Sequence, residues 1–251
     1  KMYNIELAYI QKRDGEFINS SAYQAWEGFR DLGIPTECFE YKHLINGYLP
    51  IALSKNTLVC GYISTLRQTF EELNIPEPKV LDYPLELTSF LGRNISRSTL
   101  KDIKMASAGK FIKPVQVKSF KGILCKDNIH FMMNTAMCPD DTEIYVSDPV
   151  EFLSEYRVFV NQKIVVGCKH YAGDFTLFPD INVISAAVEK YTSSPISYAI
   201  DFGITKDGRT LLVEVNDAWS LGCYGLDSRV YAELLLNRWE EIVNDSNTSI
   251  G

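Results

Sequence analysis

Apolar and polar residues in the first third of the chain follow the two spacings that strands and helices produce. Short apolar runs predict strands over residues 4–10, 57–62 and 79–83. Apolar residues at helical spacing predict helices over residues 21–32 and 64–73. Strands that alternate with helices at this distance form a parallel sheet with helices on its faces. Residues 1–90 are therefore predicted to form a small parallel α/β domain.

From about residue 90 the pattern changes to paired strands with helices between them. Hairpin strands are predicted over residues 109–117, 122–133, 156–160 with 163–168, and 197–205 with 210–216. Helices are predicted over residues 181–191 and 227–243, and the polar tail 244–251 is expected to be loose. Antiparallel hairpins mixed with helices are typical of an α+β fold, so we predict a second, α+β domain over residues 91–251.

The composition argues against two classes of partner. The chain has 251 residues, of which 46% are apolar and 23% charged, as in ordinary globular proteins. No apolar run approaches the roughly 20 residues that span a bilayer, so no membrane partner is expected. The 25 Lys and Arg against 32 Asp and Glu residues give a net charge of −7. This charge argues against a nucleic-acid partner, because a sequence-independent binder needs a basic face. A local basic groove for a small anion is compatible with it.

The six cysteines and three histidines complete no disulfide framework or zinc pattern. Free cysteine is among the most buried residue types, so we expect buried, unpaired thiols. Unpaired thiols indicate a reducing environment, and we expect a cytoplasmic protein. Because the chain begins with Lys1, a leader that has been removed stays an alternative.

The segment 197–216 carries the most informative polar residues. Asp207-Gly208 predicts a two-residue hairpin turn in which Lys206 pairs with Arg209. Counted outward from this turn, the pairing places Asp201 directly opposite Glu214.

These two carboxylates share one face of the predicted hairpin with Asn216, because side chains on a strand alternate with a period of two. Like charges directly across a strand pair are destabilising, so something should compensate them. Two carboxylates and an amide oxygen suit Mg²⁺, which also binds substrate phosphates. The alternative is a solvent-facing edge hairpin whose acids bind nothing.

Basic residues upstream could hold phosphates. Lys113 lies in the otherwise apolar run 111–114, and a buried ammonium is costly unless it is paired, so we expect it to face a cleft. Lys118 and Lys121 follow in a connection that could fold over an anion, or could simply be exposed loop lysines.

Glu155 and Arg157 share a face of the predicted strand 156–160. Arginine is suited to a planar, bidentate grip on phosphate or carboxylate. Alone, such a pair on a strand is more often part of an ordinary surface.

Together these residues resemble the ATP-grasp superfamily, and within it the carboxylate–amine ligases. Those ligases carry a strand lysine before proline, an acid-x-Arg strand, an aspartate and a Glu-x-Asn pair. The matching residues, in chain order, are Lys113-Pro114, Glu155-x-Arg157, Asp201 and Glu214-x-Asn216. Residues 166–175 are similar to the stretch after the acid-x-Arg strand in peptide-forming ligases. Arg93, Lys113 and Lys118 resemble the Arg-plus-two-Lys pattern of a small divergent clade of bacteria and phages.

The resemblance covers about residues 90–235, whereas residues 1–90 match the family's preceding α/β domain in pattern only. Two features depart from the family. The glycine-rich phosphate lid is replaced by residues 118–122, and Thr176 stands where related ligases often have an arginine.

The resemblance implies a fold of two α+β subdomains with ATP between them. Adenine and ribose would lie against Glu143, Tyr145, Val146 and Asp148. The phosphates would be held by Arg93, Lys113 and Lys118. One or two Mg²⁺ ions would be bound by Asp201, Glu214 and Asn216. Arg157 would be catalytic, and substrate carboxylates would be recognised by Lys169, Ser220 and Tyr224.

The activity implied is amide-bond formation through an acyl phosphate, with release of ADP and phosphate. The substrates would be a small-molecule or peptide carboxylate and an amine. Three alternatives stay open: a non-catalytic nucleotide-sensing module, a nucleotidyl-transferring enzyme with Lys113 adenylated, and an unrelated two-domain binding protein. The sequence predicts neither the substrates' identity nor the oligomeric state.

Overall fold

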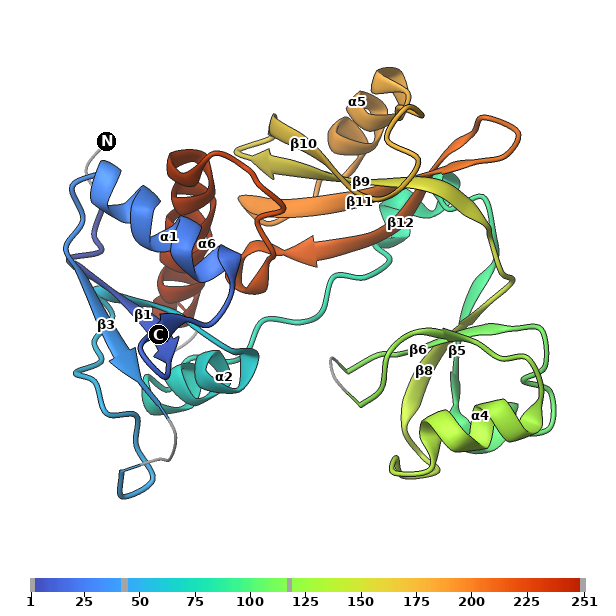
Figure 1. Ribbon diagram of the computed structural model, residues 1–251, viewed down its shortest axis with the longest axis horizontal. Helices are drawn as coiled ribbons and strands as arrows, with labels where there is room; N and C mark the ends of the chain where they lie inside the picture. The colour runs from blue at the N-terminus through green and yellow to red at the C-terminus, as the bar shows by residue number, and fades with distance from the viewer. Residues whose placement is uncertain (1–2, 42–44, 117–118, 249–251) are drawn as a thin grey trace.

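A small parallel sheet forms the first part of the chain, as the pattern predicts (Figure 1). The computed structural model describes residues 3–41, 45–116 and 119–248. The strands are β1 (Leu7–Arg13), β2 (Glu16–Phe17), β3 (Thr36–Glu40) and β4 (Thr57–Cys60). The helices are α1 (Ser20–Asp31) and α2 (Ile63–Glu72). Strand β1 lies at the centre, parallel to β3 and β4, and its end turns back as a hairpin with β2.

Two expectations for this region are wrong. Strand β3 was not predicted, because it buries only Phe39 and carries Thr36, Glu37 and Glu40. The predicted strand over 79–83 is a linker that makes only one isolated bridge, between Asp82 and Val215. Prolines punctuate this linker and remove backbone donors, so it cannot join a ladder along its length.

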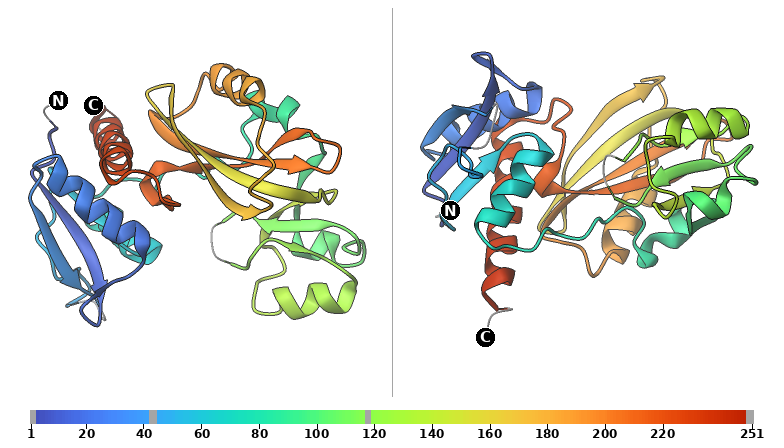
Figure 2. Two further views of the ribbon diagram at one scale, coloured as in Figure 1. Left: turned by 45° about the horizontal axis from the view of Figure 1, so that its top comes forward. Right: turned by 90° about the horizontal axis from the view of Figure 1, so that it is seen from below.

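The described residues of the second part form two further four-stranded sheets (Figures 1 and 2). The second sheet has the order β10 (Ile164–Gly173), β9 (Phe152–Asn161), β11 (Ser197–Thr205), β12 (Thr210–Asp217). The third has the order β5 (Ile95–Thr99), β8 (Glu143–Ser147), β6 (Phe111–Pro114), β7 (Ile123–Leu124). Helix α5 (Ile181–Lys190) and the 3-10 helix η1 (Leu85–Phe90) pack on the second sheet, and α3 (Leu100–Ile103) lies beside β5. The predicted class, α/β followed by α+β, is confirmed.

The predicted hairpin strand over 122–133 is wrong over most of its length. Only β7 pairs there, and helix α4 (Asn128–Thr135) follows it. Asp127 caps this helix, because its carboxylate accepts a hydrogen bond of 2.7 Å from the N–H of His130. The cap was the sequence signal that the strand interpretation overlooked.

The last helix, α6 (Ser228–Thr248), returns to the first sheet and lies beside α1 (Figure 2). Trp239 of this helix stacks on Phe70 of α2, with ring centroids 5.4 Å apart, and both belong to one apolar core. The predicted loose tail is therefore helical over residues 244–248. We keep a domain boundary near residue 90 as a proposal about chain order, since α6 shares its core with the first part.

Gly28 is where α1 approaches α6 most tightly. A Cβ at this position would lie 1.9 Å from the backbone oxygen of Ser228. We expect Gly28→Ala to lower the free energy of unfolding by about 1–3 kcal/mol, because the helices must separate to admit the methyl group. Urea denaturation should show this loss, whereas Asp31→Ala on the exposed end of α1 should change stability by less than about 0.5 kcal/mol.

The six cysteines, all in the described part of the chain, are free, as expected. Cys125 and Cys223 are buried, but Cys38 and Cys168 are exposed, so the expectation of burial is wrong for those two. Within residues 3–41, 45–116 and 119–248, no helix is long and apolar enough to cross a bilayer.

Candidate functional site

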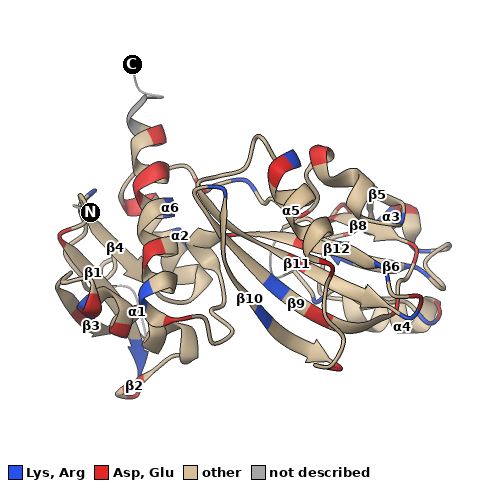
Figure 3. Cartoon of the chain, turned by 90° about the horizontal axis from the view of Figure 1, so that it is seen from above, with Lys and Arg blue, Asp and Glu red and all other residues tan. Residues whose placement is uncertain are grey.

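Four charged residues form one row across the second sheet, one from each strand. Lys169 of β10 lies opposite Arg157 of β9, Arg157 opposite Asp201 of β11, and Asp201 opposite Glu214 of β12. Directly opposed residues share a face, so the row presents two cations beside two carboxylates on one side of the sheet. Basic positions lie side by side on β9 and β10 in Figure 3.

The opposition of Asp201 and Glu214 was predicted, but the pairing that produces it differs from the prediction. Thr205 pairs with Arg209, so the loop holds three residues rather than two. A β-bulge at Val213 then shifts the register by one and restores the predicted pair.

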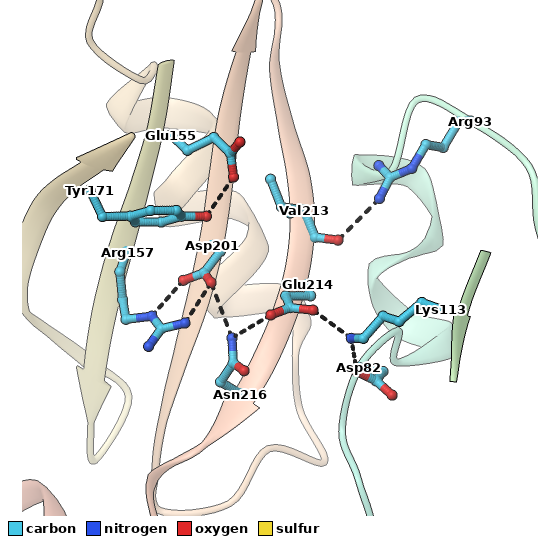
Figure 4. Close-up of polar contacts among 10 residues, drawn as sticks. All are labelled: Asp82, Arg93, Lys113, Glu155, Arg157, Tyr171, Asp201, Val213, Glu214 and Asn216. Atoms are coloured by element: carbon cyan, nitrogen blue, oxygen red, sulfur yellow. Dashed lines mark hydrogen bonds and ion pairs between the residues drawn. The ribbon is translucent and has the colours of Figure 1, made fainter. Parts of the chain in front are cut away.

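Arg93 supports this bulge. Its Nη1 donates to the carbonyl oxygens of Leu91 and Leu212, both at 2.9 Å, and its Nη2 donates to that of Val213 at 3.0 Å (Figure 4). The guanidinium is thus engaged by the main chain, whereas the resemblance implied a phosphate partner.

Arg157 and Asp201 form a bidentate ion pair in the centre of the row. Nε and Nη2 of Arg157 each lie 2.7 Å from a carboxylate oxygen of Asp201, and the residues are 7% and 2% exposed. Burial raises the pKa of Asp201, and the bonds from Arg157 oppose that shift. Asn216 connects the pair to Glu214, because its Nδ2 donates to Asp201 at 3.1 Å and to Glu214 at 3.4 Å.

Lys113 brings the third sheet to this row (Figure 4). Its Nζ lies 2.5 Å from Glu214 Oε2 and also donates to Asp82 of the linker. Burial alone would lower the pKa of Lys113, but Glu214 and Asp82 outweigh it and the pKa is raised. The ammonium is therefore firmly charged, and it connects β6, β12 and the linker.

A cavity of about 490 Å³ opens beside these groups and extends to the first sheet. Lys113, Glu214 and Asn216 line it from one side, and Ser220 lies on the loop after β12. The first domain contributes residues before and at the start of α1 and α2. Residues from all three sheets therefore surround one space that can hold a small molecule.

Two stacked tyrosines cover the basic end of the row. The rings of Tyr171 and Tyr224 lie 4.9 Å apart at 17°, and the Arg157 guanidinium lies 4.6 Å from the Tyr224 ring. Tyr171 donates a 2.6 Å hydrogen bond to Glu155, and burial raises the pKa of its hydroxyl. A bulge in β10 at Tyr171 turns the ring to this face. The tyrosines thus shield the ion pair from solvent.

The residues expected at the adenine lie on and after β8. Tyr145 stands directly between Lys113 of β6 and Arg97 of β5, and its ring packs edge-on against Tyr83 at 4.8 Å. Strand β8 pairs on both sides through Tyr145 and Val146, so their backbone groups already have ladder partners.

The other two residues of this set are exposed. Glu143 begins β8, and Asp148 follows it and pairs with Lys110 at 2.7 Å. Of the set, Asp148 is the residue whose backbone lies outside the ladder.

Sequence reasoning overlooked two site residues. Arg97 is exposed and shares the face of Tyr145 and Lys113, which the period of two over 95–99 would have indicated. Asp82 carried no local signal, because its contact with Lys113 is made across the fold. Lys118 lies outside the described residues.

The oxygen-bearing set at β11 and β12 fits a hard divalent cation in type. Asp201, Glu214 and Asn216 offer carboxylate and amide oxygens on neighbouring strands, the ligands that Mg²⁺ takes. Among the described residues, no group of three His, Cys, Asp or Glu has metal-binding geometry, so any such site needs the amide of Asn216.

Comparisons with known proteins agree with this geometry. A family model of the ATP-grasp domain, family 2 of the Arg-plus-two-Lys clade, matches residues 90–234, more than half of the chain. No curated protein matches the sequence. Among solved structures, the D-cycloserine synthetase DcsG is similar with a TM-score of 0.58 and 12% identity, over 93% of this chain and 99% of that one.

Two further structures share the fold at low identity. A RimK-domain ATP-grasp protein from Sphaerobacter thermophilus has a TM-score of 0.51 and 17% identity, over 92% of this chain and 98% of that one. D-alanine–D-alanine ligase from Bacillus anthracis, complexed with ATP, has a TM-score of 0.51 and 14% identity, over 97% and 98%. The chain belongs to the ATP-grasp family, in family 2 of its Arg-plus-two-Lys clade.

Proposed function

We propose that the protein is an ATP- and Mg²⁺-dependent ligase that joins a carboxylate and an amine. The observation that supports this most is the meeting of Lys113 with Glu214, at 2.5 Å, from two different sheets. A phosphate-binding cation and a metal-binding carboxylate set are then adjacent, as phosphoryl transfer requires. The fold neighbours named above include two ligase or synthetase structures.

ATP would lie between the second and third sheets. We assign Lys113 to the phosphates, with Arg97 beside it on the same face. Lys118 keeps this role as a proposal, whereas Arg93 is assigned to holding the bulge of β12. Asp148 and the residues directly after it are better placed to meet the adenine and ribose than Tyr145 or Val146, because their backbone groups lie outside the ladder.

Asp201, Glu214 and Asn216 would hold one or two Mg²⁺ ions, which supply neutralisation of the phosphate charge. A carboxylate oxygen of the first substrate attacks the γ-phosphorus, and ADP leaves. The amine then attacks the acyl carbon, the carbon–oxygen bond to phosphate breaks, and an amide forms. The amine nitrogen gives up its protons as this bond forms.

Arg157 would stabilise charge on the transferring phosphoryl group and on the later tetrahedral oxyanion. Lys169 lies next to it in the row, and Tyr224 stacks against it, so a substrate carboxylate can meet two cations here. Ser220 borders the cavity from the loop after β12. The substrates would be small molecules or peptides, in a cytoplasmic setting consistent with free thiols.

Product analysis tests this function. The protein is incubated with ATP, Mg²⁺ and pairs drawn from amino acids and dipeptides. We expect ADP, phosphate and a new amide mass for at least one pair. Release of AMP and pyrophosphate would instead indicate nucleotidyl transfer. Nucleotide binding without turnover of any pair would favour the sensing module.

A further inference from the structure

Asp82 is a buried acid that reaches the site from the linker between the first and third sheets. The residue is 4% exposed, and its backbone has a positive φ of 39°. Its carbonyl oxygen accepts a 2.8 Å hydrogen bond from the N–H of Val215, next to Glu214 on β12. The linker is therefore fixed to the strand that carries the metal-binding set.

The carboxylate of Asp82 depends on Lys113. Oδ1 accepts a hydrogen bond from Nζ, whereas Oδ2 is buried and has no hydrogen-bond partner among the described residues. Lys113 in turn divides its ammonium between Asp82 and Glu214. The lysine proposed to hold phosphate is thus already neutralised by two carboxylates.

We propose that Asp82 is a positioning residue that competes with the nucleotide phosphates for Lys113 and so sets nucleotide affinity. This inference rests on the proposed function. A phosphate that binds Lys113 must displace Asp82 from it and approach a second negative charge in a partly buried place. Mg²⁺ can neutralise Glu214, but the ligand set assigned above leaves Asp82 unneutralised. When ADP leaves, the contact between Asp82 and Lys113 re-forms, which favours product release.

Asp82→Asn tests this competition. Asparagine has almost the same shape and tolerates positive φ, so the linker should keep its path. We expect the affinity for ADP with Mg²⁺, measured by calorimetry on the full chain, to rise about tenfold, because one repelling charge is removed. Adenosine, which lacks phosphates, should bind both proteins equally. Asp82→Gly, which also accepts this backbone angle, should tighten ADP binding in the same direction.

Glu77→Gln is the matched control. Glu77 lies in the same linker and forms an ion pair with Arg67 at 3.0 Å instead of with Lys113. Its replacement should leave ADP affinity unchanged. Unchanged or weaker ADP binding by both Asp82 variants, in a wild-type protein that binds ADP, would overturn the inference alone. Failure of the wild-type protein itself to bind ADP with Mg²⁺ would overturn the proposed function and this inference with it.

Discussion

Glu214→Gln is expected to lower Mg²⁺-dependent ATP turnover by roughly 10²–10³-fold, the loss seen when one group that stabilises developing charge is removed. Glutamine keeps the size of the side chain but removes the charge that a hard cation prefers. The fold should persist, because Glu214 is only partly buried and Lys113 keeps Asp82 as a partner. Steady-state ADP release at saturating Mg²⁺ measures the effect, and circular dichroism checks the fold.

Asp207→Asn is the control for this variant. Asp207 lies in the loop of the same hairpin, and its ion pair with Arg209 is exposed. Turnover by this control should equal that of the wild-type protein. If Glu214→Gln turned over ATP at the wild-type rate, β12 could not be the metal-binding strand.

Arg157→Met is expected to lower the free energy of unfolding by about 3–5 kcal/mol, because it leaves a buried carboxylate without its counter-ion. Asp201 is 2% exposed, and after the substitution only Asn216 would still donate to it. Denaturation in urea at neutral pH measures the loss.

Two comparisons separate this ion pair from simple loss of packing. Arg157→Met combined with Asp201→Asn should be more stable than Arg157→Met alone, since no unpaired charge remains. Arg209→Met, which breaks the exposed pair with Asp207, should cost less than about 1 kcal/mol. Equal stability of the single and double Arg157 variants would contradict the account of a buried, coupled pair.

The metal-binding hairpin shows what sequence patterning can and cannot supply. Asp201 and Glu214 were correctly expected to lie opposite each other, and Asn216 to share their side of the hairpin. The loop is one residue longer than expected, and the bulge at Val213 cancels that difference. Period-two alternation gives the faces of a strand, but a bulge depends on distant partners such as Arg93, which bonds the carbonyls there.

Contacts between distant segments account for most of what the sequence did not reveal. The order of the second sheet places Arg157 against Asp201, 44 residues away, through strand pairings that leave no local pattern. Asp82 reaches Lys113 only because the linker crosses β12. The return of α6 to α1 has the same origin, since its apolar stripe predicts a helix but not its partner.

A crystal structure of the protein with ADP and Mg²⁺ bound tests the central assignment most directly. We expect the nucleotide between the second and third sheets, with Lys113 on a phosphate oxygen and the metal ligated by Asp201, Glu214 and Asn216. Nucleotide bound outside this space, or a metal ion ligated by none of these three side chains, would contradict the account.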